Sequence, residues 1–299
     1  MTGYRSANQV EIRTFDPGTE NDIIKIVNAY TASWPYSRPV DASVLAYWRT
    51  MGDRFQPHHM LLAYHNGAPK AFLHGEWTEE WFDVYLLAAM PGAVDEATQL
   101  LHAVEPMAKS AGSPRIDGPT HRAWRFYNGY ALGHEPYHPH WERDATEAYV
   151  RSGWCLSYAS VMMVADLSRE VAISSFPKGY VLTETRADEE FSARVFRFAA
   201  TYNDEEVASC LGRHFEKLAA PGGGSVGQLG FVGTDEAHRN RGLARRLVEC
   251  SLKRLKEWGA SECLLVTGLD NIPALRAYEN AGFERRYSLN KWSKDFPTA

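Results

Sequence analysis

The amino-acid sequence predicts an α+β fold with a mixed sheet, built from two domains in tandem. Three observations support this prediction. Short apolar runs that alternate with polar residues are interleaved with longer stretches of helical period, which is typical of sheets flanked by helices. This order of elements occurs twice along the chain. The length of 299 residues, of which 44% are hydrophobic, is enough for two domains of ordinary size.

The first half is predicted to start with a strand at 10–15 and a helix at 20–30. Residues 58–77 form two alternating runs around Asn66-Gly67, a pair that is the strongest short signal for a β-hairpin. The remaining elements expected in this half are a strand at 82–89, a helix at 93–112, a short helix at 145–154 and a buried strand at 157–166.

The segment 168–179 is predicted to be a linker, and the order of elements restarts after it. We expect a strand at 180–185 and then helices at 188–200 and 205–220. Beyond a glycine cluster the sequence predicts a strand at 228–234, a helix at 241–258, a strand at 263–268, a helix at 273–282 and two short closing strands. The first of these helices is the clearest, because its apolar residues fall on one face at 243, 247, 248, 252 and 255.

The two halves resemble diverged copies. A pattern of tyrosine, three residues, glycine and an aromatic residue occurs at 149–154 and again at 278–283. In each half it lies where a late helix is expected to run into a strand. Together with the repeated order of elements, it predicts a first domain at 1–167, a linker at 168–179 and a second domain at 180–299.

The chain carries a formal net charge of −5, which argues against nucleic-acid or membrane-surface partners, where a basic excess is expected. Its first residues lack the basic-then-apolar pattern of a secretion signal, and no apolar run approaches the ~18 residues of a membrane span. The cysteines are far apart and show no metal-ligand spacing: Cys155, Cys210, Cys250 and Cys263. We therefore expect reduced thiols and a cytoplasmic protein without a metal. A monomer and a homodimer are both open.

The segment 237–247, AHRNRGLARRL, gathers four arginines around one glycine where a helix is expected to begin after a strand. The first turn of a helix has backbone N–H groups without intrahelical partners, and they carry the positive end of the helix dipole. Gly242 and Ala244 keep this turn free of bulk, while Arg239 and Arg241 add charged donors. This context favours a site for an anion such as a diphosphate over an ordinary solvated helix start.

Residues 239–244 resemble the [Q/R]-x-x-G-x-[G/A] motif of the GNAT acetyltransferase superfamily, and they follow a strand as they do in that family. Further along, the segment 269–284 resembles the second motif of the family, with Asn271 and Tyr278 at the corresponding places. The resemblance covers about residues 228–292 well and the rest of the chain only loosely. It implies two GNAT-like domains in tandem, each a mostly antiparallel sheet flanked by helices.

The resemblance also implies how acetyl-CoA binds as a co-substrate, with no metal involved. Four residues of the strand would hold the pantetheine arm along their backbone: Phe231, Val232, Gly233 and Thr234. The amides of the arginine-rich segment would hold the diphosphate: Arg239, Asn240, Arg241, Gly242, Leu243 and Ala244. Asn271 and Ala274 would contact the carrier near its pantetheine end.

The same resemblance places Tyr278 beside the thioester sulfur, where it would protonate the departing thiolate. When an amine attacks a thioester, the site must stabilise charge on the carbonyl oxygen and supply that proton. A phenol with an ordinary pKa of ~10 stays protonated at neutral pH and can donate. Taken alone, Tyr278 is better interpreted as an amphipathic core tyrosine, and the anion motif that precedes it favours the catalytic role.

The first half is expected to have lost this apparatus. Its segment 88–101 aligns with the arginine-rich segment, but the helix there begins with Asp95 and Glu96, whose charges would repel a phosphate. We therefore expect a degenerate GNAT-like domain that shapes or covers the acceptor site. Tyr149, the counterpart of Tyr278, is then a structural residue.

Two further signals look chemical. Residues 222–227 formally match the G-x-G-x-x-G and G-x-S-x-G patterns, but both require a strand before and a helix after, and here a helix is expected before and a strand after. A flexible turn is the preferred interpretation. His134, His138 and His140 have a spacing that suggests a metal, but prolines interrupt any helix that would align them. A solvated aromatic loop is favoured there.

The sequence therefore predicts an N-acetyltransferase that transfers the acetyl group of acetyl-CoA to a primary amine of a small molecule in a ternary complex. The alternative is a non-catalytic CoA-binding sensor or regulatory module. It stays open because the second half shows only the glycine cluster where GNAT domains normally have a hairpin. A nucleotide-phosphate binder such as a kinase is a third interpretation, but the sequence has no Walker lysine to support it. Asp235, Glu236 and His238 are nearby candidates for a general base, and none is preferred.

Overall fold

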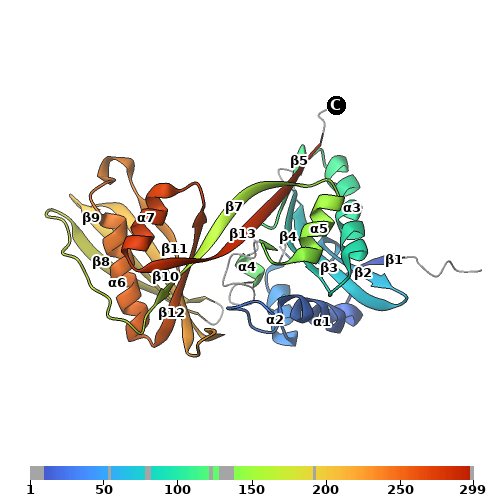
Figure 1. Ribbon diagram of the computed structural model, residues 1–299, viewed down its shortest axis with the longest axis horizontal. Helices are drawn as coiled ribbons and strands as arrows, with labels where there is room; N and C mark the ends of the chain where they lie inside the picture. Colours follow the sequence, from blue (N-terminus) through green and yellow to red (C-terminus); the bar gives the residue numbers. More distant parts are fainter. Residues whose placement is uncertain are drawn as a thin grey trace, which may run out of the picture. The chain divides into compact units, whose positions relative to one another are not determined.

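The computed structural model describes residues 10–52, 55–77, 82–120, 124–127, 138–190 and 193–296. The chain divides into unit 1, which is Met1–Ala159 with Leu289–Ala299, and unit 2, which is Ser160–Ser288 (Figure 1). These boundaries differ from the predicted ones because two long strands belong to both units. Strand β7 (Cys155–Asp166) starts in unit 1 and ends in unit 2, and β13 (Phe283–Asp295) runs from unit 2 into unit 1.

In unit 1 the strand order is β1-β2-β3-β4-β5-β13. β4 and β5 are parallel, whereas β1–β2, β2–β3, β3–β4 and β5–β13 are antiparallel. The short strand β6 also pairs with β13. The strands of this unit, besides the two shared ones, are β1 (Val10–Thr14), β2 (Met60–His65), β3 (Ala68–Trp77), β4 (Phe82–Ala89), β5 (Arg115–Gly118) and β6 (His138–Pro139).

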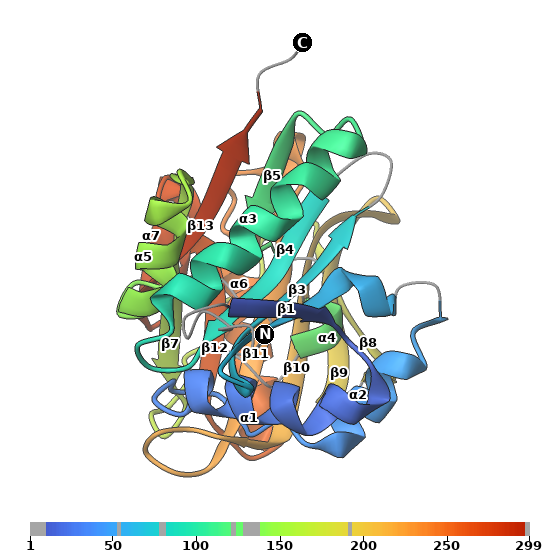
Figure 2. The same ribbon diagram turned by 90° about the vertical axis from the view of Figure 1, so that its right-hand side faces the viewer.

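The helices of unit 1 pack on this sheet, and Figure 2 shows α3 crossing its strands. Asp16 and Thr19 form a capping box just before α1, whose buried face includes Ile23 and Ile26. The helices are α1 (Glu20–Thr31), α2 (Ala42–Arg49), α3 (Val94–Ser110), α4 (Trp124–Tyr127) and α5 (Arg143–Arg151), with 3₁₀ turns η1 (Pro17–Thr19) and η3 (Pro57–His59). The structure therefore has a helix at each place where one was predicted in this half.

The hairpin predicted at Asn66-Gly67 is present between β2 and β3. Both turn residues have positive φ, 51° for Asn66 and 77° for Gly67, as a two-residue turn that matches the strand twist requires.

In unit 2 the strand order is β7-β12-β11-β10-β9-β8. β11 and β12 are parallel and the other neighbours are antiparallel. The elements are β8 (Val181–Glu190), β9 (Ala193–Tyr202), β10 (Glu205–Ala219), β11 (Ser225–Thr234), the 3₁₀ turn η5 (Glu236–His238), α6 (Leu243–Glu257), β12 (Ala260–Gly268) and α7 (Ile272–Asn280).

The two helices predicted at 188–200 and 205–220 were wrong, because these segments are the antiparallel strands β9 and β10. Their buried core residues recur at every second position, as Phe196, Phe198 and Ala200 show. That is the period of a strand, and it outweighs the helix propensity of the Ala, Arg and Glu residues around it. The turn between the strands is Asn203-Asp204, with φ of 52° and 66°.

The strands β9 and β10 form a hairpin immediately before β11, which the sequence analysis did not find. The glycine cluster at 222–224 is a turn between β10 and β11, so a strand rather than a helix precedes it. The two closing strands predicted at the end of the chain are one long strand, β13.

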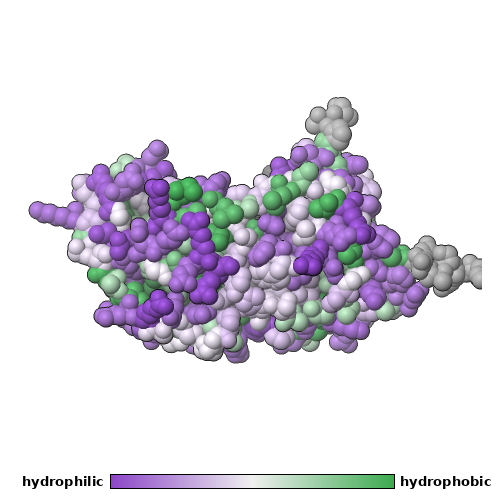
Figure 3. Space-filling view, in the orientation of Figure 1, coloured by the Kyte–Doolittle hydropathy of each residue, from purple (hydrophilic) through white to green (hydrophobic). Residues whose placement is uncertain are grey.

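Helix α6 covers the core of unit 2 with the apolar face that its sequence predicts. Leu243, Leu247 and Leu255 are buried against Phe196, among others, on the sheet. Its opposite face carries exposed charges such as Lys253 and Lys256, and the corresponding part of the surface is mainly hydrophilic in Figure 3. The sheet thus holds the helix rigidly and leaves its N-terminus, at Gly242, available for a ligand.

The histidine loop is only partly described. The solvated loop predicted around His138 is wrong at that residue, because His138 is buried. One ring nitrogen lies 2.9 Å from the Tyr30 hydroxyl and the other lies 2.9 Å from the Glu142 carbonyl. Burial lowers the pKa of His138 to about 4, so the ring is neutral at physiological pH. His134 lies outside the described residues.

Candidate functional site

A pocket of about 740 Å³ lies in unit 2, where the end of β11 meets the first turns of α6 and α7. Eleven of the thirteen residues predicted from the sequence line it: Val232, Gly233, Thr234, Arg239, Asn240, Gly242, Leu243, Ala244, Asn271, Ala274 and Tyr278. Phe231 and Arg241 do not. Four residues that the prediction did not assign to the site also line it: His238, Arg245, Pro273 and Ala277.

One wall of the pocket is a strand edge. β11 pairs with β12 over Ser225–Gln228, and β12 then continues along β7 as far as Gly268. The register between β10 and β11 shifts next to Phe231, whose φ is 50°, so the strand is bulged there. Beyond the bulge, the backbone of 232–234 has no strand partner on the β12 side among the described residues. Such an edge can pair with an extended ligand.

Phe231 itself points away from the pocket lining. Its side chain is 67% exposed, and the guanidinium carbon of Arg213 lies 6.0 Å from the ring centroid. The predicted role of Phe231 concerned its backbone, so the side chain is free to make this separate contact.

The N-terminus of α6 forms the second wall. Gly242 is its N-cap with a φ of 76°, and no side chain caps the helix. The first intrahelical bond of this turn is donated by the Arg246 amide to the Gly242 carbonyl at 3.2 Å. Within the described ranges, the amides of 240–245 donate no hydrogen bond. Uncapped amides at the positive end of a helix dipole form an anion site.

The four arginines of this segment have different partners. Arg239 Nε donates to the Thr234 carbonyl at 3.2 Å, and a guanidinium nitrogen of Arg241 donates to the Ala237 carbonyl at 3.3 Å. Arg245 pairs with the buried carboxylate of Glu249 at 2.6 Å. Arg246 donates to the backbone carbonyl of Ser175. Of the four, Arg239 and Arg245 line the pocket and Arg241 and Arg246 do not, although Arg246 also donates to the Gly242 carbonyl at 3.1 Å.

Asn271 is the N-cap of α7, and its Oδ1 accepts a hydrogen bond from the Ala274 amide at 3.3 Å. Pro273 follows at the start of the helix, where its missing N–H costs no hydrogen bond. This hydrogen bond holds Asn271 and Ala274 together at the N-terminus of α7, where both line the pocket.

Tyr278 stands on the buried side of α7 and is 8% exposed. Burial raises the pKa of its phenol, and the neighbouring Cys210 thiol raises it further. The hydroxyl has no hydrogen-bond partner among the described residues. Burial also raises the pKa of Cys210 to about 12, so this thiol is neutral. Tyr278 is therefore a protonated, unengaged donor that lines the pocket.

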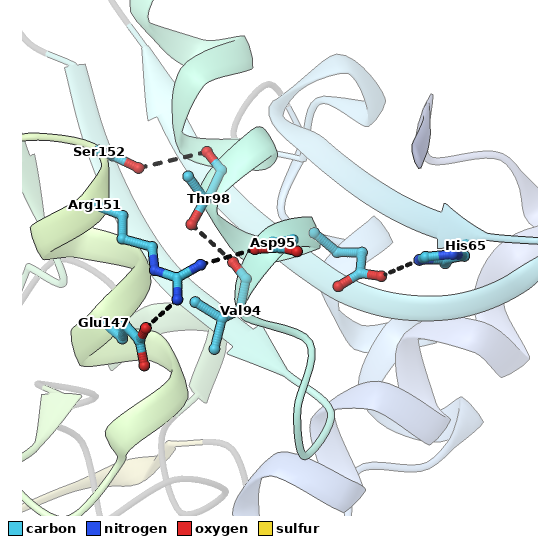
Figure 4. A network of polar contacts seen from close by, with 8 residues as sticks. His65, Val94, Asp95, Thr98, Glu147, Arg151 and Ser152 are labelled. Carbon is cyan, nitrogen blue, oxygen red and sulfur yellow. Dashed lines mark hydrogen bonds and ion pairs between the residues drawn. The ribbon is translucent and has the colours of Figure 1, made fainter. Parts of the chain in front are cut away.

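The corresponding helix of unit 1, α3, has acidic side chains at its N-terminus, shown in Figure 4. Asp95 pairs with Arg151 at 2.9 Å, and the Oε1 atom of Glu96 lies 2.7 Å from Nδ1 of His65. The Gly92 amide just before the helix donates to Asp144 at 2.6 Å. No side chain caps the amides of α3 itself, but the carboxylates of Asp95 and Glu96 lie in its first turn and repel an anionic ligand.

The described residues contain no group of three or more histidine, cysteine or acidic side chains that could hold a metal ion. No helix within those residues is long and apolar enough to cross a membrane.

Comparison with known proteins places residues 163–283 in a family model described as the acetyltransferase (GNAT) family. A mycothiol acetyltransferase of Catenulispora acidiphila is 39% identical over 82 residues, which are 26% of this chain and 26% of that protein. A mycothiol acetyltransferase of Rhodococcus erythropolis is 33% identical over 119 residues, 38% of this chain and 40% of that protein. The chain thus aligns with less than half the length of either relative.

Solved structures match over nearly the whole chain. A tandem GNAT protein from the clavulanic acid biosynthesis pathway has a TM-score of 0.71 at 13% identity and covers 97% of this chain and 100% of its own. A GCN5-related N-acetyltransferase from Sphaerobacter thermophilus has a TM-score of 0.65 at 15% identity, covering 96% and 95%. At such identities the likeness concerns the fold. The pocket lies inside the segment 163–283 that matches the GNAT family model, and the chain as a whole has the fold of the tandem GNAT proteins.

Proposed function

We propose that this protein is an N-acetyltransferase that transfers the acetyl group of acetyl-CoA to a primary amine of a small molecule by direct attack. The observation that carries the proposal is the combination, in one pocket, of uncapped amides at 240–245, a strand edge at 232–234 and the buried donor Tyr278. Each part matches one chemical feature of the carrier: the diphosphate, the amide-containing pantetheine arm and the thioester.

The residues present fit the carrier. A diphosphate needs N–H donors and positive charge, which the α6 N-terminus and the side chains of Arg239 and Arg245 offer. The amides of a pantetheine arm can pair with the backbone of 232–234 in the manner of an added strand. Acetyl-CoA supplies an activated acyl group when bound, so the chain needs no nucleophile of its own.

The chain's contribution to the chemistry follows from the state of Tyr278. Because burial keeps its phenol protonated, Tyr278 can hold a proton at the Oη atom for the sulfur that leaves. The low polarity around Tyr278 strengthens that hydrogen bond. Val232, at the bulge of β11, lines the same pocket, and the backbone amide of such a bulge is suited to charge that develops on a carbonyl oxygen.

A CoA-binding sensor without activity is the alternative. The sequence favoured it through the apparent lack of a hairpin before β11, and β9 and β10 remove that support. For the acceptor, the proposal extends to the class of small primary amines, since the relatives named mycothiol acetyltransferase align over only part of their length.

The test begins with calorimetric titration of the full chain with CoA and acetyl-CoA. It continues with a thiol-release assay against a panel of primary amines. An N-acetyltransferase binds both thioester and free carrier and releases thiol only when an amine is present. Binding without release for every amine would favour the sensor, and no binding of either carrier would overturn both.

A further inference from the structure

One residue of the pocket is held by partners far from it in sequence. His238 lies at the end of η5, immediately before Arg239, and lines the pocket. Its Nδ1 atom is 2.9 Å from the hydroxyl oxygen of Tyr180, which ends the segment between β7 and β8. Among the described residues, the other ring nitrogen, Nε2, has no hydrogen-bond partner.

The ring of His238 is also fixed by packing. It meets the Tyr180 ring nearly at right angles, with centroids 5.7 Å apart, and lies 5.3 Å from the ring of Tyr202 at the end of β9. Tyr180 and Tyr202 contact each other at 5.1 Å. Three elements of unit 2 thus converge to hold one imidazole in one orientation.

The hydrogen bond to Tyr180 has a consequence for the proton on the ring. When the phenol donates to Nδ1, the neutral imidazole carries its hydrogen on Nε2. Nε2 is then a donor, and it is the only polar atom of the side chain left for a ligand. This donor precedes the uncapped amides of 240–245 in the chain, at the phosphate half of the pocket.

We propose that His238 is a diphosphate-binding residue, whose Nε2–H donates to the phosphate oxygens of the carrier, and that Tyr180 is the positioning residue that fixes its tautomer. The inference rests on the proposed function and deepens it. It assigns to the His238 side chain part of the phosphate recognition that the sequence assigned to backbone amides and to the charges of Arg239 and Arg241. The competing role for His238 is that of a general base for the amine.

Calorimetric titration with CoA and with dephospho-CoA, which lacks the 3′-phosphate and keeps the diphosphate, tests the proposal. For His238→Gln we expect a Kd about tenfold weaker for both carriers, as for a lost hydrogen bond to a charged group. The KM for acetyl-CoA should rise together with the Kd. His102→Gln, at an exposed histidine on α3 of unit 1, is the matched control and should change nothing.

Tyr180→Phe tests the positioning role. We expect a Kd for CoA about threefold weaker, with an unchanged melting temperature. The double variant with His238→Gln should bind no more weakly than His238→Gln alone, because Tyr180 acts through the ring that is missing. Full additivity of the two effects would overturn the positioning role.

Three other outcomes would overturn the assignment of His238. A loss confined to CoA would move the contact to the 3′-phosphate. A fall in kcat with an unchanged Kd would make His238 a base. An unchanged Kd and kcat would leave it without a role. If the wild-type chain itself binds neither carrier, the proposed function fails first, and that result is read before any variant is compared.

Discussion

The N-termini of α3 and α6 are the same structural position in two diverged units, and they have opposite chemistry. In unit 1 a parallel strand pair, β4–β5, lies beside a helix whose first turn contains Asp95 and Glu96. In unit 2 the parallel pair β11–β12 lies beside a helix whose first turn contains no acid. The fold is retained in both, and only the residues at one helix end decide whether an anion can bind.

The comparison shows that an acidic first turn is the more stable of the two helix ends. The carboxylates of α3 interact favourably with the helix dipole and pair with Arg151 and His65. Neither helix has a side-chain cap, but α6 has no acid in its first turn, so the positive end of its dipole lacks the carboxylates that α3 has. Under the proposed function, the helix end kept free for the diphosphate in unit 2 therefore costs stability that the acidic helix end in unit 1 does not.

The largest effect is expected at the paired tyrosines. Tyr278→Phe should lower the turnover of acetyl transfer about a thousandfold, as for loss of a general acid, and leave the Kd for CoA within twofold. Tyr149→Phe is the matched control, because the Tyr149 hydroxyl is buried without a hydrogen-bond partner in the structure and its ring stacks on Trp292. Equal turnover for the two variants would refute the acid assignment.

The next effect transfers a feature of α3 to α6. Ala244→Asp places a carboxylate in the first turn, as Asp95 does in unit 1, and should weaken CoA binding about a hundredfold by repulsion of the phosphates. Because an acid at a helix start is stabilising, the melting temperature should not fall. Ala244→Asn is the control of similar size without charge. Calorimetry that shows the same loss for Asn and Asp would mean that bulk, and not charge, closes the site.

Unit 1 should lose free energy of unfolding as the pH falls, because it holds buried neutral histidines. Burial lowers the pKa of His74 to about 3 and that of His138 to about 4, both in unit 1. Unfolded histidines bind protons below about pH 6.5, so the stability present above that pH is lost as the pH falls, by about 1.4 kcal/mol per pH unit for each group. His74→Phe should reduce the slope of unfolding free energy between pH 6.5 and 5 by about that amount.

Tryptophan fluorescence during urea unfolding measures this slope for unit 1, because eight of the nine tryptophans belong to it and only Trp258 belongs to unit 2. The slope is compared between variants, so any loss of packing at neutral pH does not enter. A slope identical to that of the wild-type chain would show that His74 takes no part in acid unfolding.

The smallest effect separates backbone strain from ligand binding. Gly92 and Gly242 precede corresponding helices with φ of 78° and 76°. Alanine at either position should cost about 1 kcal/mol of folding free energy, because both are left-handed. Only Gly242→Ala should also weaken CoA binding, by about threefold, since a Cβ there meets the Arg246 side chain at 2.3 Å. An equal effect of Gly92→Ala on CoA binding would contradict the assignment of the site to unit 2.

Local signals in the sequence predicted much of this structure. The helical period gave α3 and α6, and Asn66-Gly67 located the first hairpin. β9 and β10 were misread because helix-forming residues surround their alternating core positions. Their turn, Asn203-Asp204, was the signal that could have corrected the interpretation.

For the pocket, the parts that depend on a contiguous motif were the predictable ones. Residues 239–244 and 271–278 form a turn and a helix start, whose geometry follows from nearby residues. His238 and Arg245 escaped assignment because their orientation depends on Tyr180 and on the linker-bound Glu249, which sequence spacing does not bring together. Arg241 was assigned through its amide and its charge, but its side chain donates to the Ala237 carbonyl and does not line the pocket.

The path of β7 and β13 affects how the protein must be made. β5 of unit 1 pairs with residues 292–295, although the rest of that unit is complete by residue 159. During synthesis, β5 therefore has no β13 partner, and the sheet of unit 1 keeps an unpaired edge, until the second unit has left the ribosome. If the chain were cut within 168–179, the first half would lack β13 and the second half would lack β7. Each half would then expose an unpaired strand edge that is prone to aggregation.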